Sequence, residues 1–116
     1  MLNMTDYEFG DVILIPFPFT DQTTSKKRPA TVVSSSIYNR MRPDLVFMAI
    51  TSQTRPTVAF GEIAIKEWNQ AGLLRPSLMK PIFATLDKQL VLKKLGRLAP
   101  EDRLSLTETL KKLLGE

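Results

Sequence analysis

The stretch Leu45-Val46-Phe47-Met48-Ala49-Ile50, followed by Thr51-Ser52-Gln53-Thr54, decides how the fold is interpreted. Its first six residues are apolar without alternation, which is typical of a strand buried on both faces. The run then changes abruptly into four polar residues. The sequence therefore predicts a central strand with polar side chains at its end.

Further short strands are expected on both sides of this segment. They are rich in β-branched and aromatic residues and are separated by proline, glycine and polar residues. Pro16 and Pro18 follow the first of them, which predicts that it runs onto an edge or a bulge. Polar loops are expected at 20–27 and at 34–44, and a turn at 68–74. The expected strands are Val12–Ile15, Ala30–Val33, Val58–Ile65, Leu78–Leu86 and Leu90–Leu98.

The end of the chain carries the signals of a helix. Pro100 suits the first helical position, acidic residues follow it, Lys111 and Lys112 suit the last turn, and Gly115 suits the C-cap. We expect one face of this helix to pack on the sheet, formed by Leu104, Leu110, Leu113 and Leu114 with Thr107 between them. The prediction is a single α+β, mainly β domain over 1–116, a five- or six-stranded, mainly antiparallel barrel with a C-terminal helix.

The composition limits the chemistry that is available. The chain of 116 residues contains no cysteine and no histidine, which excludes disulfides, thiolate catalysis and a Cys/His zinc site. We therefore expect no metal and no cofactor. The N-terminus lacks a basic region followed by an apolar stretch, and no apolar run reaches membrane-spanning length. A cytoplasmic protein without membrane contact is expected.

The positive charge is unevenly distributed. The segment 22–60 holds six basic residues against Asp44 alone, a net charge of +5, so the remainder carries −1 of the total of +4. Such a cluster is expected of a site for a polyanion, although solvated basic loops are commoner.

Several short motifs occur in an order that resembles the MazF/PemK family of toxins. The resemblance extends over about residues 10 to 114, and it depends on the order of the motifs because none is specific alone. The motifs are Gly10-Asp11-Val12, Phe17-Pro18-Phe19-Thr20-Asp21, Lys27-Arg28-Pro29-Ala30, Ala49-Ile50-Thr51-Ser52-Gln53, Gly72-Leu73-Leu74 with Pro76-Ser77, Thr85-Leu86-Asp87-Lys88 and Leu95-Gly96-Arg97-Leu98.

The resemblance implies a small SH3-like barrel, similar in fold to the gyrase poison CcdB, that pairs into a homodimer. It also implies a toxin of a type II toxin-antitoxin system, an endoribonuclease acting on single-stranded RNA (an mRNA interferase) and restrained by a cognate antitoxin. The catalytic residues of the family match Arg28 and Thr51 here.

These two residue types suit RNA cleavage without a metal, because RNA carries its own nucleophile in the 2′-hydroxyl. Arg28 offers a planar fork of donors for two phosphate oxygens, and the family's arginine is described as the proton donor to the 5′-oxygen. The hydroxyl of Thr51 would position the phosphate. From the residues alone, Arg28 reads as the solvated end of a basic run, and Thr51 as a strand former or a cap.

Other residues are weaker candidates for RNA binding. Exposed charges and core aromatics explain them equally well. They are Lys26, Lys27, Ser52, Gln53 and Arg55, with Phe19 or Tyr38 stacking on a base.

The general base is an open question. Several family members carry an acidic residue in the strand after the Gly-Leu element, whereas this chain has Lys80-Pro81-Ile82-Phe83 there. The base is therefore Asp21, another carboxylate, or no side chain, and catalysis is slow or lost if none serves.

Two other classes of function are compatible with the sequence, because fold alone proves no activity. One is a non-catalytic nucleic-acid-binding or gyrase-poisoning homologue of the same fold. The other is a purely structural subunit. The sequence does not specify the RNA cleavage motif, the class of target RNA or the identity of the antitoxin.

Overall fold

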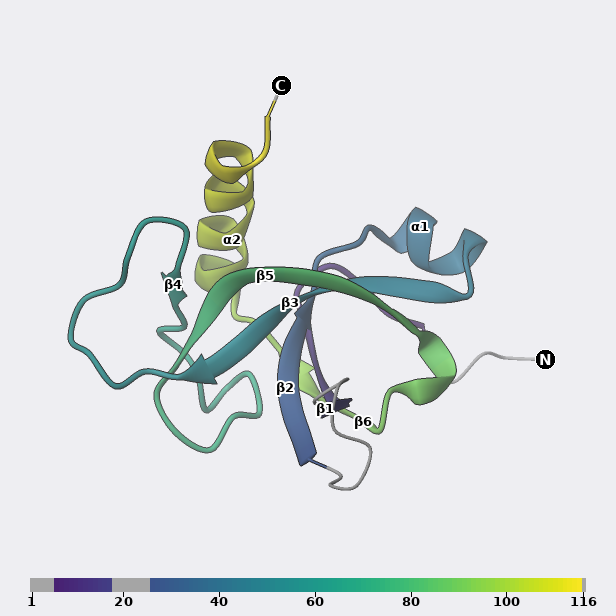
Figure 1. Cartoon of the computed structure of the whole chain (residues 1–116), viewed down its shortest axis with the longest axis horizontal. Coiled ribbons are helices and arrows are strands. Elements are labelled where there is room, and N and C mark those ends of the chain that lie inside the picture. Colours follow the sequence, from purple (N-terminus) through teal and green to yellow (C-terminus); the bar gives the residue numbers. More distant parts are fainter. Residues whose placement is uncertain (1–5, 18–25, 116) are drawn as a thin grey trace.

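The predicted central strand lies in the middle of a curled antiparallel sheet in the computed structural model, which describes residues 6–17 and 26–115. The sheet has six strands in the order β4-β5-β3-β2-β1-β6, and each neighbouring pair is antiparallel. The strands are β1 (Asp11–Phe17), β2 (Lys26–Val32), β3 (Asp44–Ser52), β4 (Ile63–Ala64), β5 (Ser77–Asp87) and β6 (Lys93–Arg97). The curl carries β3 and β5 across β2 and β1, forming a half-barrel (Figure 1).

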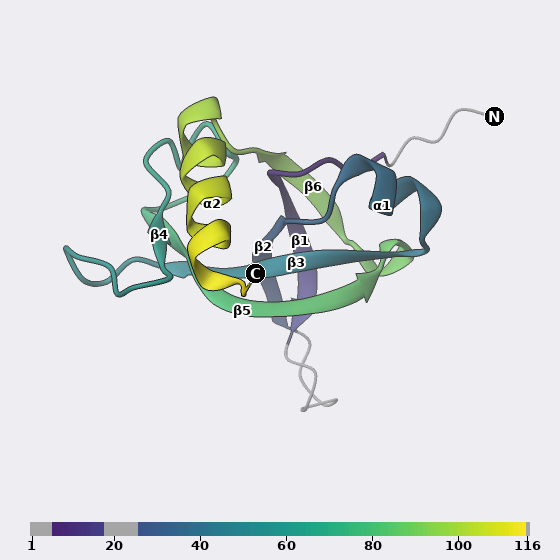
Figure 2. The same cartoon turned by 90° about the horizontal axis from the view of Figure 1, so that it is seen from above.

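Three helical segments complete the fold. α1 (Ser36–Met41) joins β2 to β3, the 3-10 turn η1 (Lys88–Leu90) joins β5 to β6, and α2 (Pro100–Leu113) closes the described chain. Figure 2 shows α2 near β4 and α1 toward the opposite end of the sheet. Among the described residues, neither helix is long and apolar enough to cross a membrane. The predicted mainly β architecture with a C-terminal helix is confirmed.

Both faces of the sheet are buried, which explains the uninterrupted apolar run of β3. Met48 and Ile50 enter a core cluster with residues of α2 and of the segment 63–73, whereas Leu45 and Phe47 enter a second cluster on the other face. Burying alternate side chains in two cores requires a strand that is apolar at every position.

The predicted edge position of the prolines in the first strand is confirmed for Pro16. β1 pairs with β6 only over 11–14, but with β2 as far as Phe17. Pro16 therefore lies where one side of β1 has no strand partner among the described residues, so its missing N–H costs no ladder hydrogen bond.

The strand expected at Val58–Ile65 is mostly wrong, because only Ile63–Ala64 pair with β5. A turn interrupts the segment. The backbone N–H of Glu62 donates to the carbonyl of Ala59, and the Glu62 side chain accepts from the N–H of Ala59. Gly61 has a φ of 91°, which other residues rarely adopt. The β-branched composition is therefore overridden by local hydrogen bonds.

The connection expected at 34–44 contains the short helix α1, which the prediction missed. The hydroxyl of Ser35 accepts from the N–H of Tyr38 and caps the helix. Asn39 is buried and its side-chain amide donates to the carbonyls of Tyr7 and Ser34. The serine run alone predicts a loop, whereas Ser35 caps a helix that begins at Ser36.

The buried face of α2 differs from the expected one. Leu106 is fully buried and Leu110 and Leu113 pack on the same core, whereas Leu104 and Leu114 are exposed. The cause is Asp102, a buried carboxylate that accepts the backbone N–H groups of Lys66 and Glu67. Anchoring this side chain inward fixes the rotation of the helix, and residues 106, 110 and 113 follow on the same face.

Candidate functional site

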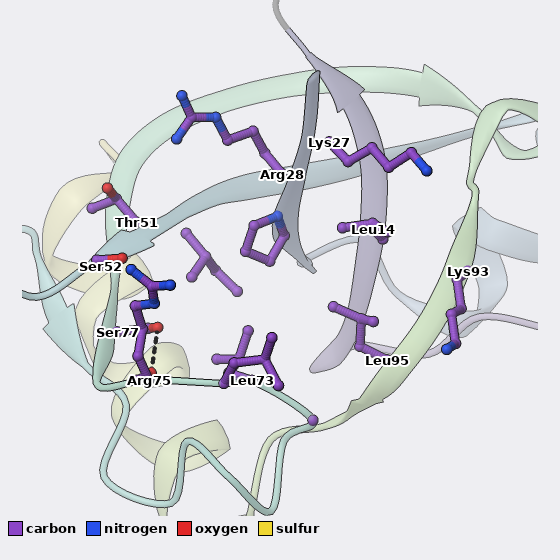
Figure 3. A pocket seen from close by; sticks show the side chains of 14 residues that line it. Leu14, Lys27, Arg28, Thr51, Ser52, Leu73, Arg75, Ser77, Lys93 and Leu95 are labelled. Atoms are coloured by element: carbon purple, nitrogen blue, oxygen red, sulfur yellow. Dashed lines mark hydrogen bonds between the residues drawn. The ribbon is translucent and has the colours of Figure 1, made fainter. Parts of the chain in front are cut away.

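A cavity of about 640 Å³ lies where β2 and β3 separate. β1 and β6 line it as well, and the segment between Gly72 and Ser77 closes one side (Figure 3). The site therefore combines strand ends that are far apart in the sequence.

Pro29 explains why the cavity opens at this point. In β2 the carbonyl of Val32 accepts from Gly10, which precedes β1, whereas the N–H of Val33 donates to Val46 in β3. Main-chain groups alternate along a strand, so position 29 faces β3 like position 33. Proline has no N–H to donate there, and the pairing of β2 with β3 ends at Ala30 and Ala49.

The separated strand ends carry Arg28 and Thr51. Extending the β2–β3 register by two residues places them opposite each other, and both side chains line the cavity. Arg28 is exposed, and its guanidinium carbon lies 5.6 Å from the ring centroid of Phe17 in the neighbouring strand. Figure 3 shows its guanidinium group on the side of the cavity where Thr51 and Ser52 lie.

Arg28 and Thr51 also border a second, smaller cavity of about 230 Å³. Its walls are mainly apolar, and include Phe17, Phe47 and Ile82, with Lys80 as its second basic side chain. The two residues thus stand between a cationic cavity and an apolar one.

The segment after Leu73 brings a second arginine to the main cavity. Arg75 lines it, and its guanidinium group points toward Ser52 (Figure 3). The buried hydroxyl of Ser77 donates to the carbonyl of Arg75 at 2.8 Å, and the N–H of Gln53 donates to the carbonyl of Pro76 at 3.0 Å. The loop is therefore tied to the end of β3.

Two glycines allow this segment to pass close to β6. Gly72 has a φ of 88°, and a Cβ on it would overlap the backbone carbonyl of Leu95. A Cβ on Gly96 would lie 2.6 Å from the carbonyl oxygen of Ala71. Because only glycine permits these close approaches, Gly72 and Gly96 hold the cavity-lining segment that begins at Gly72 against β6.

Among residues 6–17 and 26–115, four basic side chains line the cavity and no carboxylate does. Lys27 and Lys93 lie toward Leu14 and Leu95, and Arg28 and Arg75 lie toward Thr51 (Figure 3). In the described part of the chain, none of the four forms an ion pair with a carboxylate. Residues 6–17 and 26–115 also contain no group of three acidic side chains that would hold a metal ion. An anion is the ligand that this charge distribution favours.

The sequence matches the family described as PemK-like, MazF-like toxin of type II toxin-antitoxin system over residues 8–114. The chain belongs to the PemK/MazF toxin family. The match covers the whole sheet and both helices.

Solved structures of MazF-like proteins share the fold of this PemK/MazF chain. A MazE-MazF crystal structure from Deinococcus radiodurans aligns with a TM-score of 0.74 at 18% identity, covering 96% of this chain and 98% of the other. An endoribonuclease from a Mycobacterial species aligns with a TM-score of 0.72 at 20% identity, covering 94% and 91%. An endoribonuclease in complex with its cognate antitoxin, also Mycobacterial, gives 0.71 at 19% identity, covering 94% and 93%. Among curated proteins no sequence matches.

The residues that the sequence proposed for this PemK/MazF site are only partly gathered in the cavity. Lys27, Arg28, Thr51 and Ser52 line it. Lys26 is exposed at the start of β2 but does not line the cavity. Phe19 and Asp21 lie outside the described residues.

Gln53 and Arg55 are engaged with each other and with Glu62. The side-chain amide of Gln53 donates to the carbonyl of Arg55, and the Arg55 guanidinium pairs with the Glu62 carboxylate at 3.2 Å. The N–H of Ala59, with Arg55, holds the pKa of Glu62 below its usual value. Neither Gln53 nor Arg55 lines the cavity.

Tyr38 lies away from the cavity, at the α1 end. Its hydroxyl donates to Asp44 at 2.8 Å, and this hydrogen bond raises the pKa of Tyr38 above its usual value. Arg42 pairs with the same carboxylate and lies over the Tyr38 ring. These contacts give Tyr38 a structural role.

Sequence reasoning missed Arg75 and Lys93 as residues of the PemK/MazF cavity. Arg75 stands between two motifs that carried the resemblance, Gly72-Leu73-Leu74 and Pro76-Ser77, and this position was an available signal. Lys93 had no such signal, because it is one of two adjacent lysines at the start of the last strand.

Proposed function

We propose that this toxin is a sequence-selective endoribonuclease that cleaves single-stranded RNA without a metal ion. The observation that carries the proposal is the placement of Arg28 and Thr51 at the open ends of adjacent strands, inside a cavity where every charged side chain of the described residues is basic. A phosphodiester is the anion in RNA that a guanidinium and a hydroxyl bind together.

The reaction needs no nucleophile from the protein. The 2′-oxygen of the ribose attacks the phosphorus, the bond to the 5′-oxygen breaks, and the products are a 2′,3′-cyclic phosphate and a 5′-hydroxyl. Arg28 stabilises the charge that develops on the phosphoryl oxygens and supplies the proton to the departing 5′-oxygen. Thr51 donates to a phosphoryl oxygen and orients it.

The proton of the 2′-hydroxyl passes to solvent or to a carboxylate. No acidic side chain lines the cavity among the described residues. Asp21, outside those residues, is the carboxylate in the Phe-Pro-Phe-Thr-Asp motif that we propose for this role. Lys27, Lys26 and Ser52 would contact the neighbouring backbone of the RNA.

Two partners follow from the same surface. A homodimer would enlarge the area available to an RNA strand, because one 13.1 kDa protomer offers little surface for several nucleotides.

A cognate antitoxin with an acidic and apolar tail would cover the cavity, pairing with Arg28. Leu74, 91% exposed at its rim, would contact the apolar side chains of the tail. Such a pair would act in the cytoplasm, where messenger RNA is translated.

The experiment is cleavage of a mixed-sequence single-stranded RNA by purified protein in the presence of a chelator, followed by mapping of the new 5′ ends. The expected product accepts a radioactive phosphate from polynucleotide kinase without prior dephosphorylation, because its 5′ end is a hydroxyl. A strict requirement for magnesium, or a 5′-phosphate on the product, would contradict the mechanism. Growth arrest with intact RNA and altered DNA supercoiling would instead indicate gyrase poisoning.

A further inference from the structure

Arg75 is one of four arginines of this protein that form no ion pair with a carboxylate among the described residues. In the described part of the chain, Arg42, Arg55 and Arg97 each form an ion pair at 3.1 or 3.2 Å, and Arg103 donates to a backbone carbonyl. The guanidinium of Arg75 has no acidic partner among those residues, although it is exposed at the cavity. Its charge is available to a ligand.

The backbone that carries Arg75 is held in place from two directions. Ser77, only 4% exposed, donates its hydroxyl to the carbonyl of Arg75 itself. Gln53, two residues after Thr51, donates its N–H to the carbonyl of the next residue, Pro76. Proline also restricts the conformation of the residue before it. Little backbone entropy is therefore left to lose when Arg75 binds a ligand.

Arg75 and Arg28 reach the cavity from different elements. Arg28 comes from β2 beside Thr51, and Arg75 comes from the loop before β5 beside Ser52 and Ser77 (Figure 3). Thr51 and Ser52 are consecutive residues of β3, so their side chains leave the strand in different directions. The cavity thus presents two pairs of one guanidinium and one hydroxyl.

We propose that Arg75, with Ser52, binds the RNA phosphate adjacent to the scissile one, and that Ser77 is a positioning residue for Arg75. This inference rests on the proposed function, in which Arg28 and Thr51 hold the scissile phosphate. Arg75 contacts a phosphate that undergoes no reaction, so it contributes equally to the binding of substrate and transition state. Loss of Arg75 should then raise KM and leave kcat nearly unchanged.

The first test measures binding of an uncleavable RNA, in which 2′-fluorine replaces every 2′-hydroxyl, as a function of salt concentration. Arg75→Ala should weaken binding about tenfold, as expected for one charge-assisted contact. It should also make the salt slope shallower by about 0.7, because one fewer phosphate is neutralised. Arg75→Lys should keep the slope, and the control Arg42→Ala, which removes a paired arginine, should change neither quantity.

The second test identifies the phosphate. Once the cleavage site is mapped, an uncharged methylphosphonate replaces each flanking phosphate in turn. At one flanking position the substitution should weaken binding by the wild type but add little to the effect of Arg75→Ala, which is the non-additivity expected of direct partners. In a Ser77→Ala variant, the methylphosphonate at that same RNA position should weaken binding less than it does in the wild type. The Ser77→Ala variant should still cleave RNA.

The outcomes separate the two proposals. A wild type that neither binds nor cleaves single-stranded RNA would overturn the proposed function. A wild type that cleaves, with an Arg75→Ala variant whose salt slope and KM are unchanged, would overturn the role of Arg75 alone. A fall in kcat with unchanged KM would place Arg75 on the scissile phosphate and would also contradict the inference.

Discussion

The basic side chains of β6 are of two kinds, those that line the cavity and those that pair with carboxylates. Lys93 lines the cavity together with Lys27, Arg28 and Arg75, and no carboxylate of the described residues lines it with them. In the same strand, Lys94 pairs at 3.2 Å with Asp11, a buried carboxylate, and Arg97 pairs with Glu8 at 3.2 Å. We call the first group the cavity cluster and the second, formed by Glu8, Asp11, Lys94 and Arg97, the Asp11 cluster.

The difference shows that the number of basic residues does not locate an anion site, whereas their partners do. An arginine that is already paired loses an interaction when it turns to a ligand, and an unpaired one does not. The cavity cluster keeps an unsatisfied positive potential, and the Asp11 cluster neutralises itself. In β6, Lys93 is therefore available to a ligand, whereas Lys94 and Arg97 are used in ion pairs within the fold.

The largest expected effect separates the two clusters by activity. Arg28→Ala should lower the rate of RNA cleavage by about 10²- to 10³-fold, the usual loss when one donor to a developing anion is removed. Arg97→Ala should leave the rate unchanged, because its charge is used within the Asp11 cluster. The measurement is single-turnover cleavage, with circular dichroism to verify the fold. Equal losses of cleavage rate in both variants would contradict the distinction between the cavity cluster and the Asp11 cluster.

The second effect concerns the backbone approach that shapes the cavity. Gly72→Ala should lower the free energy of unfolding by about 2–4 kcal/mol, because its Cβ would overlap the Leu95 carbonyl and its positive φ disfavours alanine. Gly115→Ala is the matched control, since a Cβ there meets no atom within 4 Å. Urea unfolding followed by fluorescence of Trp68 measures both. A Gly72→Ala variant as stable as the control would show that the close approach of Gly72 to the Leu95 carbonyl does not constrain the fold.

The smallest effect concerns the carboxylate of Glu62, which pairs with Arg55, and it depends on pH. The pKa of Glu62 is lowered, first by the N–H of Ala59 and also by Arg55, so ionised Glu62 stabilises the folded state. This contribution is complete above the pKa that Glu62 has in the unfolded chain, about 4.3, and disappears as pH falls through the lower pKa of the folded state. Glu62→Gln should therefore lower Tm slightly at pH 7 and not at all in strong acid.

The matched control for the pH experiment is Glu108→Gln. Glu108 is exposed on α2, and no hydrogen bond or ion pair of its side chain occurs within the described residues. Thermal unfolding across the acid range should show a pH-dependent difference for Glu62→Gln and none for Glu108→Gln. A difference at Glu62 that persists in strong acid would mean that packing, and not charge, is responsible.

The distribution of charge in the sequence indicated an anion site but placed only part of it. Of the six basic residues in the segment 22–60, Lys27 and Arg28 line the cavity, whereas Arg42 and Arg55 are ion-paired. The two other cations of the cavity, Arg75 and Lys93, come from outside that segment. Local charge counts do not record which carboxylate a cation meets after folding.

The sequence by itself determined the elements whose signals are local. The central strand followed from an apolar run and the first turn of α2 from Pro100, since proline acts through its own backbone. Tertiary structure alone decided the rest. Asp102 set the buried face of α2, Glu62 and Gly61 shortened β4, and close approaches at Gly72 and Gly96 brought the segment before Arg75 against β6. Each of these depends on hydrogen bonds or steric contacts between segments, and such contacts exist only once the chain has folded.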